Sequence, residues 1–184
     1  MDAVVSLIDT SNSFQANDFN KWVDEFGITL NNPERFPLHL TWHAADQYNL
    51  LSLANVLSHL AVKGDPFKVR TAGFGIFTGK MPVFYITLVK TRFLMEFHEE
   101  IWRSVSNYAI KSQVHFAPEN WVPHITLNTI EVISKEIIRK LQSVTFREME
   151  YEIVINNIAL IYKKEELSGI LEKYELSKEI RDDV

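Results

Sequence analysis

The sequence contains no cysteine. Disulfide bonds and thiolate chemistry are therefore excluded, and any metal site would have to be built from His, Asp or Glu. No apolar run approaches the ~20 residues that a membrane-spanning helix needs. The first residues, Met1-Asp2, carry an acidic group where a signal peptide carries positive charge. We therefore expect an intracellular, cytoplasmic protein with no membrane partner.

The chain also lacks an excess of positive charge, since its net charge is −5. Proteins that bind long duplex nucleic acid usually present a broad basic face, so we expect no such partner. A small nucleotide or an RNA end needs only a few local cations and stays possible. With 184 residues, 46% of them apolar and 23% charged, the chain is suited to one globular domain with its own core, which we expect to be monomeric.

Two short segments share one residue pattern, His39-Leu40-Thr41-Trp42 and His124-Ile125-Thr126-Leu127, called here the first and second motif. Polar and apolar residues alternate in both, which predicts strands in which the histidine and the threonine share a face. Histidine titrates near neutral pH, so a converging pair can hold one neutral and one protonated imidazole. The pattern therefore marks four candidate catalytic residues: His39, Thr41, His124 and Thr126.

The order of predicted elements repeats along the chain as strand, helix, motif strand, helix, strand, over about residues 1–80 and 81–184. Strands are expected over Val4–Ile8, Phe36–His43, Phe67–Phe77, Val83–Val89, Trp121–Leu127, Glu152–Tyr162 and Leu171–Leu176. Helices are expected over Phe14–Phe26, Asp46–Val62, Phe93–Ala109 and Ile133–Leu141. We predict a single α+β domain of two pseudo-twofold lobes. Antiparallel sheets with flanking helices would bring the two motif strands face to face across a central cleft.

These motifs resemble the signature of the 2H phosphoesterase superfamily, in particular its 2'-5' RNA ligase and cyclic phosphodiesterase (LigT-like) branch. That signature is two H-h-[T/S]-h segments, where h is hydrophobic, and Trp121–Leu127 has the characteristic Trp-x-Pro-His-x-Thr-Leu form. Trp42 departs from the smaller aliphatic residue usual at its position. The resemblance implies a metal-independent enzyme without a cofactor. Its substrates would be 2',3'-cyclic phosphate or 2'-5' phosphodiester bonds of RNA ends or nucleotides.

The residues themselves suit such a reaction. One neutral imidazole would take a proton from water or a ribose hydroxyl, while the opposite imidazolium protonates the departing oxygen. Thr41 and Thr126 would donate hydrogen bonds to the non-bridging phosphoryl oxygens. The sequence does not distinguish the base from the acid. Two alternatives stay open: a hydrolase of small signalling cyclic or 2'-5' oligonucleotides, and a catalytically silent nucleotide-binding module.

Three aromatic residues are candidates for stacking on a base: Phe74, Phe77 and Trp121. Aromatic residues in strands are more often part of the core, and that alternative applies to each of them. Gly73 and Gly75 flank Phe74 inside a predicted strand. Glycines in such a position indicate a β-bulge or the close approach of a ligand or of another backbone.

His43 is a further candidate for substrate binding, because alternation places it on the same strand face as His39. His39, His43 and His124 together could form a three-histidine metal site. That interpretation leaves both threonines unexplained, so we predict no metal site. His59 and His98 fall in predicted helices, where a surface or packing role is expected.

Overall fold

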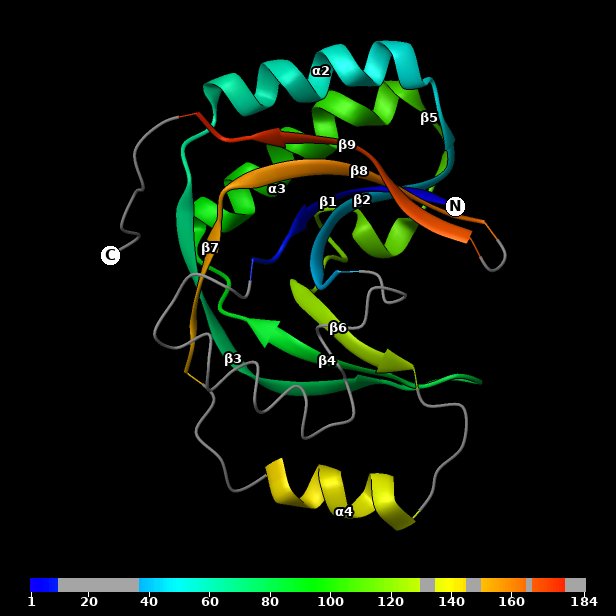
Figure 1. The fold of residues 1–184 in the computed structure, drawn as a ribbon, viewed down its shortest axis with the longest axis vertical. Coiled ribbons are helices and arrows are strands. Elements are labelled where there is room, and N and C mark those ends of the chain that lie inside the picture. Colours follow the sequence, from blue (N-terminus) through cyan, green and yellow to red (C-terminus); the bar gives the residue numbers. More distant parts are fainter. Residues whose placement is uncertain (10–36, 130–134, 145–149, 165–166, 178–184) are drawn as a thin grey trace.

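The computed structural model describes residues 1–9, 37–129, 135–144, 150–164 and 167–177 (Figure 1). The helix expected over Phe14–Phe26 lies outside these residues. The strands are β1 (Asp2–Leu7), β2 (His39–Tyr48), β3 (Phe67–Phe77), β4 (Val83–Leu88), β5 (Ala109–Ser112), β6 (His124–Thr129), β7 (Glu152–Ile155), β8 (Asn157–Lys164) and β9 (Leu167–Glu175). The helices are α2 (Leu50–Lys63), α3 (Arg92–Val105) and α4 (Lys135–Val144), with 3₁₀ turns η1 (Ser106–Tyr108) and η2 (Val114–Phe116).

All the strands join one antiparallel sheet in the order β7-β3-β4-β6-β2-β1-β8-β9, and β5 also pairs with β2. The sheet curls, so that β3, β4 and β6 form one wing and β2, β1, β8 and β9 the other (Figure 1). The strands that open the two halves, β1 and β4, flank the motif strands β2 and β6 symmetrically. The α+β class is confirmed, and the repeated order of elements stays a prediction, because the helix expected over Phe14–Phe26 lies outside the described residues. One detail changes: the motif strands are direct neighbours in one sheet.

Helices α2 and α3 lie together on one side of the sheet, whereas α4 lies at the far end beyond β3 and β4 (Figure 1). Asn49 caps α2 by accepting from the Ser52 backbone N–H, and Thr91 caps α3 by accepting from that of Leu94 at 3.1 Å. Both helices bury apolar residues at helical spacing: Leu53, Leu57, Leu60 and Ala61 in α2, and Leu94, Phe97, Ile101 and Val105 in α3. They thereby cover the face of the sheet opposite the one that carries the motif histidines.

No helix in the described ranges combines the length and apolar character needed to cross a membrane.

Three element boundaries differ from the prediction because of β5, which was not predicted. Strand β2 continues to Tyr48 rather than ending at His43, because its second half pairs with β5, as at Ala45 with Ser112 and Gln47 with Ile110. Helix α2 consequently begins at Leu50. Helix α3 ends at Val105 instead of Ala109 because Ala109–Ser112 forms the new strand.

Gly73 takes a role predicted for the glycines of β3, whereas Gly75 is approached by a side chain and not by a ligand or another backbone. The register with β4 shifts between Thr71 and Phe74, and Gly73 has a φ of 104°, which confirms the bulge. A Cβ atom on Gly75 would lie 2.3 Å from Cζ of Tyr85. The close approach expected at Gly75 is therefore that of a neighbouring tyrosine side chain.

Candidate active site

The two motifs meet directly. Strands β2 and β6 are antiparallel and paired at Leu40 and Ile125, which are both fully buried. In an antiparallel pair, the residues next to Leu40 lie opposite the residues next to Ile125. His39 is therefore the cross-strand neighbour of Thr126, and Thr41 is that of His124. Directly opposite residues point to the same face of a sheet, so both histidines and both threonines share the face opposite the buried pair.

The neighbouring strands extend this arrangement. On β1, Leu7 pairs with His39 and Val5 with Thr41. On β4, Tyr85 pairs with Thr126 and Thr87 with His124. Two rows of side chains therefore cross four strands, Leu7-His39-Thr126-Tyr85 and Val5-Thr41-His124-Thr87.

Both histidines are oriented by the same backbone contact. Nδ1 of His39 lies 2.8 Å from the carbonyl oxygen of Pro37, and Nδ1 of His124 lies 2.6 Å from that of Val122. A carbonyl oxygen only accepts, so Nδ1 carries the hydrogen in each ring. In the neutral imidazole, Nε2 is then the nitrogen that can take a proton. Each motif thus fixes the tautomer that acid–base chemistry at Nε2 requires.

Aromatic rings surround His124. The centroids of Phe77, Tyr85 and Phe116 lie 4.9, 5.2 and 6.5 Å from that of its imidazole. Burial among these rings lowers the pKa of His124, and the bond to the Val122 carbonyl opposes this only in part. His124 is therefore a neutral ring near pH 7, the state in which Nε2 accepts a proton.

Of the two phenylalanines predicted from β3, only Phe77 lies beside the motifs. Its ring stacks on Tyr85 at 4.0 Å and meets His124 edge-on. Phe74 pairs with Ile86 and stacks on Phe84 at 5.3 Å, on the core face of the sheet. Phe74 is therefore not placed to contact substrate beside the motifs, because it lies three residues from Phe77 in a regularly paired stretch, and residues an odd number apart point to opposite faces.

The prediction that Trp121 stacks on a base is also wrong. Its side chain is 1% exposed, and it packs against Trp42 and His98 with ring centroids 5.4 and 3.8 Å apart. Its Nε1–H donates to the carbonyl oxygen of Thr41 at 3.0 Å. Trp121 therefore supports the first motif from behind and offers no surface to a ligand.

A bulge in β2 explains why His43 does not share a face with the first motif. Val5 of β1 pairs with Thr41, but the next residue, Val4, pairs with His43, so Trp42 is an extra residue on β2. The extra residue reverses the alternation. His43 consequently faces the core, where it is fully buried.

The contacts of His43 exclude it from substrate and metal binding. Its Nδ1 lies 2.5 Å from the hydroxyl of Tyr48, and burial together with the nearby His98 lowers its pKa to about 4. It cannot join His39 and His124, because they lie on the opposite face. Among the described residues, no group of three or more His, Asp or Glu side chains is placed to hold a metal ion.

Three further residues border the motifs and were not predicted: Tyr85, Thr87 and Phe116. Tyr85 and Thr87 lie two residues apart in β4, so both point to the face that carries the motif histidines. Their spacing within a clearly predicted strand could have identified them from the sequence. The Thr87 hydroxyl also donates to the carbonyl oxygen of Gly73 at 3.3 Å. Phe116 had no local signal, because only the tertiary fold brings η2 beside His124.

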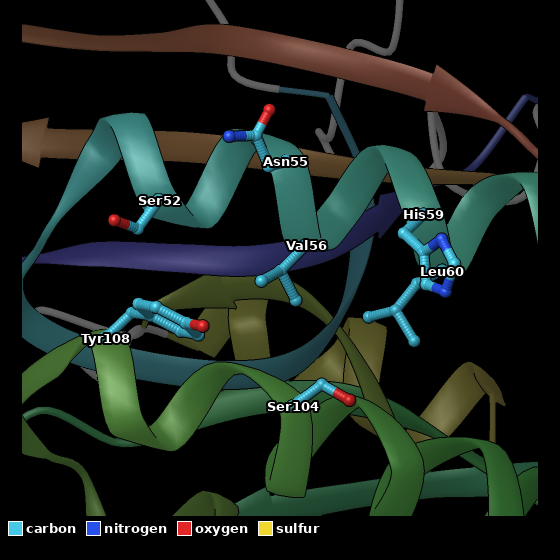
Figure 2. Close-up of a pocket in the computed structure, with 7 residues that line it drawn as sticks. All are labelled: Ser52, Asn55, Val56, His59, Leu60, Ser104 and Tyr108. Carbon is cyan, nitrogen blue, oxygen red and sulfur yellow. The ribbon is translucent and has the colours of Figure 1, made fainter.

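A separate groove of about 650 Å³ lies between α2 and the end of α3. Figure 2 shows Ser52, Val56 and Leu60 of α2 pointing toward Ser104 and Tyr108 of the facing segment. This groove is on the helix-covered side of the sheet, and none of the four motif residues lines it. It is not part of the candidate active site.

A curled antiparallel sheet, helices on its outer face and two adjacent His-x-Thr strands on the other define the class of 2H phosphoesterases. A model of the 2'-5' RNA ligase superfamily matches residues 20–153. The chain belongs to this superfamily, which supports an enzyme of the phosphodiesterase type.

Solved structures share the fold at low sequence identity. TT0787 of Thermus thermophilus is 18% identical over 95% of this chain and 97% of its own, with a TM-score of 0.58. E. coli LigT complexed with 3'-AMP is 12% identical over 96% and 98%, with a TM-score of 0.60. E. coli LigT complexed with ATP has the same identity and coverage and a TM-score of 0.56. No protein of curated function matches the chain.

Proposed function

We propose that the protein is a metal-independent phosphodiesterase that acts on 2',3'-cyclic phosphate or 2'-5' phosphodiester bonds of RNA ends or nucleotides. The observation that carries this proposal is the register of β2 and β6, which sets each motif histidine beside the threonine of the other motif. The LigT structures with 3'-AMP and ATP support a small nucleotide as the ligand.

His124 is the general base in the hydrolytic direction, because its aromatic surroundings keep the ring neutral. Its Nε2 takes a proton from water as the water oxygen attacks phosphorus. The bond from phosphorus to one ribose oxygen breaks. The imidazolium of His39 then donates its Nε2 proton to that oxygen, leaving a phosphomonoester and a free hydroxyl. With a ribose hydroxyl of a second end in place of water, the same proton transfers join two ends: a new phosphorus–oxygen bond forms to that hydroxyl while one phosphorus–oxygen bond of the cyclic phosphate breaks.

Thr41 and Thr126 hold the phosphate between the two rings. Each hydroxyl projects from the same face as the histidines and can donate to a non-bridging oxygen as negative charge gathers there. Because the strands fix both side chains before substrate arrives, little reorganisation accompanies the reaction. All four residues come from one chain, which supports a monomer as the active form.

The rings beside His124 suit the base of a small nucleotide. Phe77 and Phe116 are partly exposed, and their ring centroids lie 4.9 and 6.5 Å from that of the His124 imidazole. Stacking on a base tolerates any base, because each has a π-face. Small signalling cyclic or 2'-5' oligonucleotides fit the same chemistry and are tested as alternative substrates.

The deciding experiment incubates the protein with 2',3'-cyclic AMP, a 2'-5' dinucleotide and a cyclic oligonucleotide in the presence of EDTA, with products separated by chromatography. We expect turnover of one of the first two. Turnover of the cyclic oligonucleotide alone would favour the signalling function. Binding of 3'-AMP without turnover of any substrate would indicate a silent binding module, and activity that EDTA removes would contradict metal independence.

A further inference from the structure

Strand β2 changes partner beside the first motif. Within the described residues, its registered pairing with β6 is at Leu40, and pairing with β5 starts at Ala45. Between these points, three of its carbonyl oxygens accept hydrogen bonds from outside the sheet. The donors are Trp121 Nε1 for Thr41 at 3.0 Å, His98 Nε2 for Trp42 at 3.0 Å and the Gln113 backbone N–H for Ala44 at 2.8 Å.

His98 of α3 spans this change of partner. It is fully buried, and its Nε2 lies 3.0 Å from two carbonyl oxygens, those of Trp42 in β2 and of Phe116 in η2. Both partners only accept, so Nε2 carries the hydrogen, and the ring is neutral because burial lowers its pKa to about 4. One donor thus ties the bulge that follows Thr41 to the segment whose phenylalanine ring borders His124.

Trp121 completes the connection. Its indole stacks on the His98 imidazole with centroids 3.8 Å apart and planes 19° apart, while its Nε1–H holds the Thr41 carbonyl. It also lies three residues before His124 in the chain. These two side chains therefore hold β2 and η2 from the core side, and Trp121 is linked to β6 through the chain.

We propose that His98 is a positioning residue that, with Trp121, sets the placement of Thr41 relative to His124. This inference rests on the proposed function. Among the described residues, the registered pairing of the two strands is limited to Leu40 and Ile125, so contacts outside the ladder also bear on where the backbone at Thr41 lies. The His98–Trp121 pair supplies such contacts, because its ring nitrogens hold the carbonyl oxygens of Thr41, Trp42 and Phe116 from the core face, opposite the motif side chains.

The test compares His98→Leu, which removes the donor, with His98→Gln, whose side-chain amide can still donate near the Nε2 position. We expect His98→Leu to lower kcat for 2',3'-cyclic AMP about tenfold or more with KM within twofold, since small displacements of catalytic groups cost up to about 10²-fold. His98→Gln should restore most of kcat. Ile101→Val, a buried change on the same helix, is the matched control and should retain the wild-type kcat.

A second readout does not depend on turnover. In wild type, the Thr41 methyl group and the His124 ring should give a nuclear Overhauser effect, which His98→Leu should weaken and His98→Gln restore. An unchanged effect in His98→Leu would overturn the inference whatever the activity. If the wild type shows no turnover while the nuclear Overhauser effect is weaker in His98→Leu, the proposed function is refuted and the positioning role of His98 stands.

If His98→Leu does not fold, Trp121→Phe decides, because it keeps a ring for stacking and removes only the donor to the Thr41 carbonyl. We expect a weaker nuclear Overhauser effect between Thr41 and His124 in this variant. An unchanged effect would overturn the inference.

Discussion

The two faces of the sheet use histidine in opposite ways. His39 and His43 lie on one strand, yet the bulge at Trp42 places them on opposite faces. His39 and His124 are partly exposed and bonded through Nδ1 to a carbonyl two residues earlier. His43 and His98 are fully buried, each with a pKa lowered to about 4. A backbone contact thus fixes the tautomer of one pair, whereas burial keeps the other pair neutral.

The largest effect should come from the exposed face. We expect His39→Ala and His124→Ala each to lower kcat for 2',3'-cyclic AMP by about 10²- to 10⁴-fold, because each removes a general acid or base. Circular dichroism should show an unchanged fold. His59→Ala, an exposed histidine on α2, is the control and should keep wild-type activity. Near-wild-type hydrolysis by either motif variant would refute the assignment.

The two histidines buried on the core face, His43 and His98, should instead make the free energy of unfolding depend on pH in the acid range. In the unfolded chain His43 and His98 have a pKa near 6.5, whereas in the folded protein each is about 4. The unfolded state therefore binds protons first as the pH falls, so stability is full above 6.5 and is lost between 6.5 and 4. Each ring contributes at most about 3 kcal/mol to this loss.

Urea unfolding at pH 5 and pH 7 measures this loss. His43→Phe should reduce the difference in unfolding free energy between the two pH values, because it removes one titrating ring. His115→Phe, at an exposed position, should leave the difference unchanged. Equal pH dependence in His43→Phe and wild type would show that His43 does not titrate as its burial requires.

The sequence predicted the two motif strands correctly, because local alternation marks them, and the four catalytic candidates that they carry stay a prediction. Prediction from the sequence failed where pairing with another strand determines which face a residue points to, or whether a segment is a strand at all. His43 was misplaced because the bulge arises in the pairing of β1 with β2. β5 was missed because its four residues follow directly on α3 and η1, and their partner lies far earlier in the chain.

The surroundings of the motifs were harder still to predict. Trp121 carries the strongest family signature, but its burial follows from contacts with Thr41 of β2 and His98 of α3. Phe116 lies beside His124 only because η2 is bonded through its carbonyl to His98. The motif strands can thus be predicted from the sequence, whereas the side chains packed behind and beside them depend on tertiary contacts.

A smaller effect should distinguish the threonines from other hydroxyls. Thr41→Val and Thr126→Val keep the shape of the side chain and remove the donor, so we expect each to lower kcat about 10²-fold, as loss of one oxyanion donor does. Thr78→Val, at an exposed position between β3 and β4, is the matched control. Initial rates with 2',3'-cyclic AMP are measured for all three variants. Equal rates for Thr41→Val and wild type would show that Thr41 does not bind the phosphate.

The smallest effect compares the two faces with one substitution. Phe77 lies beside His124, and Phe74 lies on the core face three residues earlier. Each is changed to leucine. Loss of an aromatic ring that stacks on a base costs about 1–3 kcal/mol, and leucine keeps part of the apolar contact, so we expect Phe77→Leu to raise KM about fivefold. Phe74→Leu should lower the melting temperature and leave KM unchanged. Equal KM values in the two variants would mean that Phe77 does not contact the base, and that the aromatic rings around His124 serve only to keep its imidazole neutral.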